Sequence, residues 1–150
     1  MAHEITTTIE IAATPENVWA VLADLTSYSE WHPMYLAVTG RPAAGSTLTI
    51  TTTHPTSGRT MTAKVRVRTA EPGKELRWVS SLLGVTISER VFRLSPAADG
   101  TSLEQAGTYR GVGGNRVRGT VKTITRIEDS FVAINQAIKQ QAEARQRASG

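Results

Sequence analysis

The stretch that decides the fold is TPENVWAVLADLTSYSEWHP, residues 14–33. Thr14 is a good helix N-cap, and Pro15 stands at the first helical position, where its missing N–H costs nothing. Apolar residues then recur at helical spacing and predict one buried face: Val18, Val21, Leu22 and Leu25. The helix is expected to end in an aromatic, histidine-bearing turn stopped by Pro33. A short helix placed after one strand and before a run of strands is typical of few folds.

The rest of the chain reads as strands followed by one long helix. Strand-like runs cover residues 3–13, 46–54, 60–70, 75–83, 85–94 and 101–110. Residues 34–45 are expected to be irregular, because Gly40, Pro42 and Gly45 interrupt them. From about Val121 to about Gln146 apolar residues recur at helical spacing. These patterns predict an α+β helix-grip fold: a curved antiparallel sheet of about six to seven strands wrapped around the long C-terminal helix.

Length and composition limit the class of protein. A chain of 150 residues with 39% hydrophobic content can bury one core, so residues 1–150 are expected to form a single domain. There is no cysteine, which excludes disulfide and thiolate chemistry. No apolar run approaches the roughly 20 residues of a membrane span, and the N-terminus lacks a secretory pattern. The sequence therefore predicts a soluble cytoplasmic protein.

The histidines argue against a metal centre. His3, His32 and His54 show no close ligand spacing such as HExxH. No metal and no cofactor are therefore expected.

Successive residues of a strand point to opposite faces of the sheet, so the apolar residues of each strand identify its inward face. Several polar residues share that inward face. These residues are Thr52, His54, Ser80, Ser88, Arg90, Gln105 and Tyr109. A buried guanidinium needs a partner, so Arg90 is expected to reach Gln105, Asn135, Glu128 or a ligand oxygen. The alternative is a one-residue bulge that would turn Arg90 to solvent.

The inward strand positions converge on the stripe of the long helix and predict an internal cavity of several hundred Å³, in the usual range for ligand sites. Its expected lining is Leu48, Ile50, Val65, Trp78, Phe92, Tyr109, Phe131 and Ile134. The other candidates for ligand contact are Trp31, His32, Tyr35, Thr52, Ser88, Gln105 and Asn135. Trp31, His32 and Tyr35, the aromatic trio, have two interpretations. They form the rim of the pocket, or they pack the short helix against the sheet.

The chain resembles the START-like, Bet v 1-like superfamily in its bacterial polyketide cyclase/dehydrase and lipid transport branch. The resemblance covers about residues 4–142 and is carried by residues 14–33, EPGKELRW at 71–78, ERVFRL at 89–94, DGTSLEQAGTYRG at 99–111 and FVAINQAIK at 131–139. It implies a helix-grip wrapper around an apolar pocket that binds hydrophobic small molecules. Some members of this family cyclise and dehydrate polyketide chains, and many only bind.

The chain also departs from that family pattern. Many relatives carry a histidine in the ERVFRL strand and a His-x-Glu pattern in the next strand, where this sequence has Arg90, Gln105 and Gly107. A cationic donor, an amide and the phenol of Tyr109 remain, and such a set can orient a carbonyl and stabilise an enolate. The catalytic candidates are Arg90 for the oxyanion, Tyr109 as donor, and His54 as proton acceptor, with His32 as the other histidine available.

The predicted function is binding of a polycyclic or polyketide-like molecule, with or without its cyclisation and dehydration. The alternatives are a non-catalytic carrier or sequestering protein for a lipid or natural product, and a regulatory interaction module. A basic stretch comprises Arg110, Arg116, Arg118, Lys122 and Arg126. It is either a solvated face or a surface that steers an acidic ligand or an acidic acyl carrier protein. It lacks interleaved aromatics, so nucleic acid is not an expected partner. A monomer or weak homodimer is expected.

Overall fold

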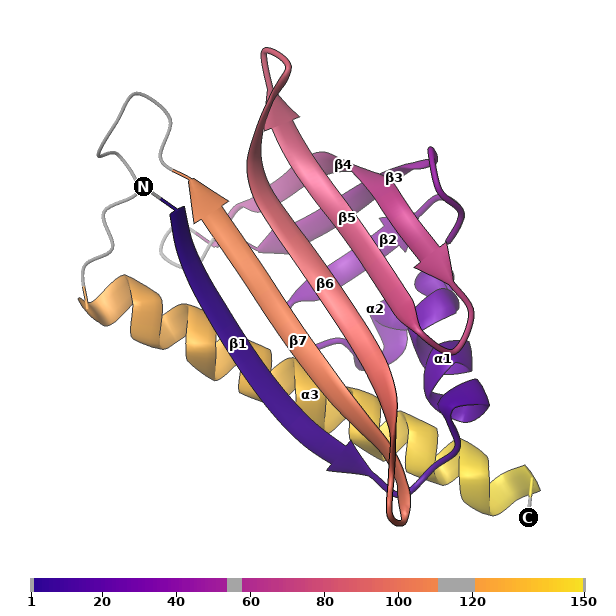
Figure 1. Cartoon of the computed structure of the whole chain (residues 1–150). Coiled ribbons are helices and arrows are strands. Elements are labelled where there is room, and N and C mark those ends of the chain that lie inside the picture. Colours follow the sequence, from indigo (N-terminus) through magenta and orange to yellow (C-terminus); the bar gives the residue numbers. More distant parts are fainter. Residues whose placement is uncertain (1, 54–57, 111–120, 150) are drawn as a thin grey trace.

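In the computed structural model, residues 2–53, 58–110 and 121–149 are described, and they form a curved sheet that packs against the long helix α3 (Figure 1). The strands of the described residues are β1 (Ala2–Ile11), β2 (Tyr35–Thr39), β3 (Thr47–Thr53), β4 (Thr60–Glu71), β5 (Glu75–Leu82), β6 (Val85–Ala97) and β7 (Gly100–Arg110). Every pairing is antiparallel, in the order β1-β7-β6-β5-β4-β3-β2. The helices are α1 (Pro15–Ala23), the 3-10 turn η1 (Leu25–Ser27), α2 (Tyr28–Trp31) and α3 (Val121–Ser149). The α+β helix-grip architecture is confirmed.

The decisive stretch forms three short pieces where one helix was predicted. Thr14 is the N-cap, and its Oγ1 accepts the N–H of Asn17 at 3.2 Å. The helix then ends early, because the carboxylate of Asp24 accepts the hydroxyl of Ser27 at 2.7 Å. Such local side-chain bonds compete with the helical ladder, and the chain restarts as η1 and α2.

Strand β2 was missed by the sequence interpretation, which expected residues 34–45 to be irregular. This five-residue strand lies at the edge of the sheet, pairs with β3, and has a register shift between Tyr35 and Ala37. Val38 is buried in it, whereas Leu36 and Thr39 are exposed. So short an edge strand carries too little alternation to outweigh Gly40 and the breakers that follow.

The core lies between the inner face of the sheet and α3. The helix presents one buried stripe, which comprises Phe131, Ile134, Ile138 and Ala142. The strands face it with Leu48, Leu76, Phe92 and Leu103, each almost fully buried. A fully buried side chain of this kind stabilises the fold by about 1.5–3 kcal/mol. In Figure 1 α3 runs along the β1 and β7 side of the sheet, while α1 and α2 close the other end. No helix of the described residues combines the length and the apolar character needed to cross a membrane.

Candidate functional site

A cavity of about 190 Å³ opens on the inner face of the sheet between β3 and β6. Its lining consists of Tyr35, Ile50, Thr52, Ala63, Val65, Trp78, Ser80, Ser88, Glu89 and Arg90. Strand alternation explains this set, because Ile50, Val65 and Trp78 share the inward register with the hydroxyl residues beside them. Its volume is smaller than the several hundred Å³ predicted.

Four residues of the predicted lining, two on strands and two on α3, lie elsewhere in the structure. Leu48, Phe92, Phe131 and Ile134 do not border this cavity, since all four are almost fully buried in the packed core. The helix approaches β1 and β7 closely, so its apolar stripe meets the sheet directly and fills the space that was expected to be empty. The cavity is therefore displaced toward the hairpin end of β5 and β6.

Arg90 lies on the inner face, as its register with Phe92 predicts. A bulge does occur in β6, but it leaves Ile87 unpaired in the ladder, on the hairpin side of Arg90, and so does not reverse the register at 90. The Nη1 of Arg90 donates to Oε1 of Gln105 at 3.2 Å. Its Cζ stands 4.4 Å from the centroid of the Phe131 ring, a cation–π arrangement. The solvent-facing alternative is therefore excluded.

A buried polar network holds Gln105, the partner of Arg90, in place. The Nε2 of Gln105 donates to Oδ1 of Asn135 at 2.6 Å and to the carbonyl of Phe131 at 3.2 Å. The Nδ2 of Asn135 donates to Oγ1 of Thr7 at 2.8 Å, and that hydroxyl donates to the carbonyl of Gln105 at 3.3 Å. The network ties β1, β7 and α3 together, and two of its members, Gln105 and Asn135, are almost fully buried.

The network changes the roles expected of its members. Gln105 and Asn135 were candidates for direct ligand contact, but the amide of Gln105 uses its oxygen and both N–H groups inside the protein. They position Arg90 instead. Thr7 was missed altogether, because a threonine inside the run Thr6–Thr8 carries no signal of its own.

His32 cannot act as the proton acceptor that the sequence left open. Its Nδ1 accepts the backbone N–H groups of Met34 at 3.0 Å and Tyr35 at 2.9 Å, so the ring proton must reside on Nε2. Burial, and then the positive charge of Arg90, lowers the pKa of His32 to about 3. The imidazole stays neutral, stacked on the ring of Tyr35 at 4.0 Å between centroids.

The aromatic trio therefore divides between the two interpretations. Tyr35 borders the cavity, which is the rim role. His32 is buried and fastens the turn after α2 to the start of β2. Trp31 faces a different groove, between α1, α2 and the end of α3, where Asp24 and Arg145 also lie.

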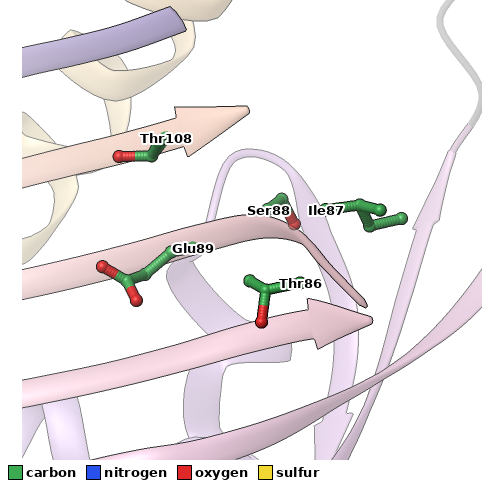
Figure 2. Close-up of a pocket in the computed structure, with 5 residues that line it drawn as sticks. All are labelled: Thr86, Ile87, Ser88, Glu89 and Thr108. Atoms are coloured by element: carbon green, nitrogen blue, oxygen red, sulfur yellow. The ribbon is translucent and has the colours of Figure 1, made fainter. Parts of the chain in front are cut away.

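One wall of the cavity is polar. The hydroxyls of Ser80 and Ser88 lie 2.7 Å apart, and Thr52 is nearby in the lining. Ser88 also borders a second hollow of about 340 Å³ at the base of the β5–β6 hairpin, with Thr86, Ile87, Glu89 and Thr108 (Figure 2). The carboxylate of Glu89 accepts from Nη1 of Arg77 at 2.7 Å, which engages it in an ion pair.

Several predicted features fall outside the described residues. His54 and the glycine-rich segment 111–119 belong there, together with Arg116 and Arg118. Tyr109 lies in β7 with its backbone opposite Ser88, but its side chain is not among those described. The same holds for the side chains of Arg110, Lys122 and Arg126. Their roles stay predictions.

Residues 2–143 match the model of the family described as polyketide cyclase / dehydrase and lipid transport. The chain belongs to this family. Membership supports a ligand-binding, cyclase-like role in general terms. No curated protein matches the sequence.

Solved structures agree with the fold of this polyketide cyclase/dehydrase family member. It is similar to the Zhui aromatase/cyclase of Streptomyces sp. R1128, with a TM-score of 0.77, 21% identity, and coverage of 100% of this chain and 99% of that one. The di-domain ARO/CYC StfQ of the steffimycin pathway gives 0.77 at 15% identity, over 97% of this chain and 52% of StfQ, so the chain spans about half of that protein. Ara h 8.0201 gives 0.72 at 10% identity, over 96% and 99% of the two chains.

Proposed function

We propose that this chain binds an oxygen-bearing hydrophobic molecule of the polyketide-like class in the cavity between β3 and β6. The observation that carries the proposal is the guanidinium of Arg90, which lies on the inner face of the sheet and borders hydroxyl and apolar groups. The other charged residue of the lining, Glu89, forms an ion pair with Arg77. A carbonyl or carboxylate oxygen is the natural partner for such a donor. A hydrogen bond to a charged group is also stronger in a site that excludes water.

The cavity also suggests the size of the bound group. At about 190 Å³ it has room for about six water molecules of roughly 30 Å³ each. This is enough for a ring-sized portion of a ligand, with Ile50, Val65 and Trp78 against its faces and the hydroxyls of Ser80 and Ser88 at one edge. The rest of a longer ligand would extend beyond the cavity.

Matched aromatic probes test the proposal. We expect 2-naphthoate to quench the fluorescence of Trp78 and to bind at least about tenfold more tightly than 2-methylnaphthalene, because only the acid offers oxygen to Arg90. Arg90→Met keeps the approximate volume and removes the donor, so this preference should disappear. Trp78→Phe identifies the part of the signal that arises in the cavity.

Two controls make the result decisive. Thermal unfolding of Arg90→Met shows whether the variant still folds, since Gln105 loses a partner in it. Arg90→Lys keeps the charge and should retain most of the preference. Equal affinity of the unchanged protein for the two probes would refute the role of Arg90. No binding of either probe would refute the cavity as a ligand site.

Cyclisation with loss of water is the second candidate, favoured by the family match. Arg90 would stabilise an enolate, but a base is also needed. Among the described residues that line the cavity, the charged ones are Arg90 and Glu89, and Glu89 is held by Arg77. The candidate for the base is thus His54, which lies outside the described residues, and Tyr109 stays the candidate donor. A cyclase would turn over a model poly-β-keto thioester and lose that activity in Arg90→Met, whereas a carrier would bind it unchanged. An acidic acyl carrier protein as donor of the ligand, and a monomeric or weakly dimeric state, stay predictions.

A further inference from the structure

Charges on the outer face of the sheet are paired across β5, β6 and β7. Arg77 contacts Glu89 at 2.7 Å and Glu75 at 3.1 Å, and Arg93 contacts Glu75 at 3.2 Å and Glu104 at 2.7 Å. The four contacts make a continuous ladder in which each arginine lies between two carboxylates. This part of the surface has three carboxylates and two guanidinium groups, all of them paired, so it offers little to an anionic partner.

Strand β4 carries the opposite pattern on the same face. Lys64, Arg66 and Arg68 are all exposed there. Their cross-strand neighbours are uncharged: Lys64 pairs with Thr49, and Arg66 lies between Thr47 and Val79. In the part of the chain that the structure describes, no carboxylate forms an ion pair with any of the three cations. The result is a row of uncompensated positive charge.

The β5–β6 hairpin places apolar side chains in solvent beside that row. Leu83 at its tip is 95% exposed and has a φ of 51°, and Val85 is 58% exposed. A left-handed backbone conformation favours glycine or asparagine, and an exposed leucine gains no packing in return. The positive φ of 80° at Gly84 explains why a glycine stands there. The turn gives no such reason for a leucine at position 83. In Figure 1 this hairpin projects beyond the ends of its neighbouring strands.

The cationic row and the hairpin border the same hollow. A depression of about 430 Å³ is lined by Lys64, Arg66 and Arg68 together with Ser81 and Gly84 of the hairpin region. The Nη2 of Arg68 donates to Oγ1 of Thr86 at 3.3 Å, which fixes its guanidinium beside the hairpin. The exposed tip of the hairpin therefore lies beside a hollow that three cations border.

We propose that this hairpin surface, comprising Leu83, Val85, Lys64, Arg66 and Arg68, docks on anionic lipid bilayers. Leu83 and Val85 insert at the boundary of head groups and acyl chains, and the three cations contact lipid phosphates. An acidic protein surface would also attract the cations. An acidic protein surface does not account for the exposed leucine at a projecting tip, however. The apolar interior of a bilayer does account for it, because it can accommodate the leucine side chain. This function lies beyond ligand binding in the cavity and does not depend on it.

Vesicle co-sedimentation of the ligand-free protein tests the proposal. We expect binding to vesicles that contain phosphatidylglycerol and much weaker binding to phosphatidylcholine alone, with a decline as salt screens the charges. Lys64→Glu and Arg66→Glu should each weaken binding about fivefold or more, given the usual contribution of a basic residue near an anionic surface. Leu83→Asn should weaken binding by a similar factor and leave the fold intact, because asparagine tolerates a positive φ.

Lys74→Glu is the matched control, since Lys74 is an exposed cation in the β4–β5 turn at the opposite end of these strands. It makes the same charge change and should leave binding unaltered. The proposal is overturned if anionic vesicles do not bind the protein, or if Lys74→Glu weakens binding as much as Lys64→Glu, which would indicate net charge alone. Loss of binding in the charge variants with no effect of Leu83→Asn would also overturn it, and would point to an acidic protein as the partner.

Discussion

A single histidine shows how the environment of one residue sets its chemistry. His32 has both a buried ring and two backbone N–H groups donating to Nδ1, and these features keep it neutral. Its stacking on Tyr35 and Tyr28 makes the ring part of the aromatic packing at the end of α2. The residue that looked like a spare base is thus a fixed structural group beside the cavity.

The lowered pKa of His32 predicts acid sensitivity. The folded-state pKa of about 3 lies below the ordinary value near 6.5, so the unfolded chain takes up a proton as the pH falls and the folded chain does not. The stability contributed by neutral His32 is complete above pH 6.5 and is lost as the pH falls toward 3. From about pH 7 to about pH 5 we expect this group alone to remove about 2 kcal/mol from the free energy of unfolding.

His32→Asn is the variant that isolates this effect. Its Oδ1 can still accept the N–H groups of Met34 and Tyr35, but the side chain does not titrate. Urea unfolding at several pH values should show a flatter dependence for the variant than for the unchanged protein between pH 7 and 5. The same slope in both proteins would show that His32 is protonated in the folded state.

At the scale of elements, the turn between β6 and β7 is fitted against the end of β1. Gly100 has a φ of 155°, and a Cβ there would meet the carbonyl oxygen of Ile11 and the backbone of Ala13. Beside it, Oγ1 of Thr101 donates to the carbonyl of Ala13 at 2.7 Å. The close approach of two backbones joins the first strand to the last hairpin, ahead of the helix that starts at Pro15.

Gly100→Ala should therefore destabilise the protein strongly. The added methyl group collides with backbone rather than with a flexible side chain, so we expect a loss of more than about 2 kcal/mol in the free energy of unfolding. Gly73→Ala is the control, since Gly73 has a φ of 76° but nothing within 4 Å of its Cβ position. Conformational strain alone should cost about 1–2 kcal/mol there. Chemical denaturation that gave equal losses for the two variants would contradict the steric explanation.

At the scale of the whole molecule, the two ends of the sheet differ in how firmly they are held. β1 and β7 are bound to α3 by the Thr7, Gln105 and Asn135 network and by the packed stripe of the helix. At the other end β2 is a short edge strand with a register shift, and the cavity lies behind β3 and β4. Local stability is expected to follow this difference, because few buried contacts mean easier opening.

Hydrogen exchange measures that gradient. The backbone amides of Leu103 and Gln105 in β7 and of Ile134 in α3 should exchange near the rate of global unfolding. Those of β2, such as Val38, should exchange through local opening at a much lower free energy. Addition of a ligand that fills the cavity should slow exchange in β3 and β5 more than in β7. Uniform protection across the sheet would contradict the picture of a firm and a loose end.

Local pattern was enough to predict a large part of this protein. The N-cap at Thr14, the alternation in β4 to β7 and the stripe of α3 each depend on neighbours a few residues apart, and each was predicted correctly. The same alternation placed Arg90 inside and in reach of Gln105. Strand β2 and the break at Asp24 were missed, since both depend on weak signals within a few residues of a breaker or a cap.

The sequence by itself determined which face of each element is inward, and the tertiary structure alone decided how closely those faces approach. Periodicity records direction, whereas the volume left between a helix and a sheet depends on residues far apart in the chain. Thr7 and Asn135 are separated by 128 positions and meet at 2.8 Å. That closeness fills the space beside Phe131 and Ile134 and moves the cavity toward Trp78 and Ser88. It also fixes Gln105 as the support of Arg90, a role that no pattern within a single strand could reveal.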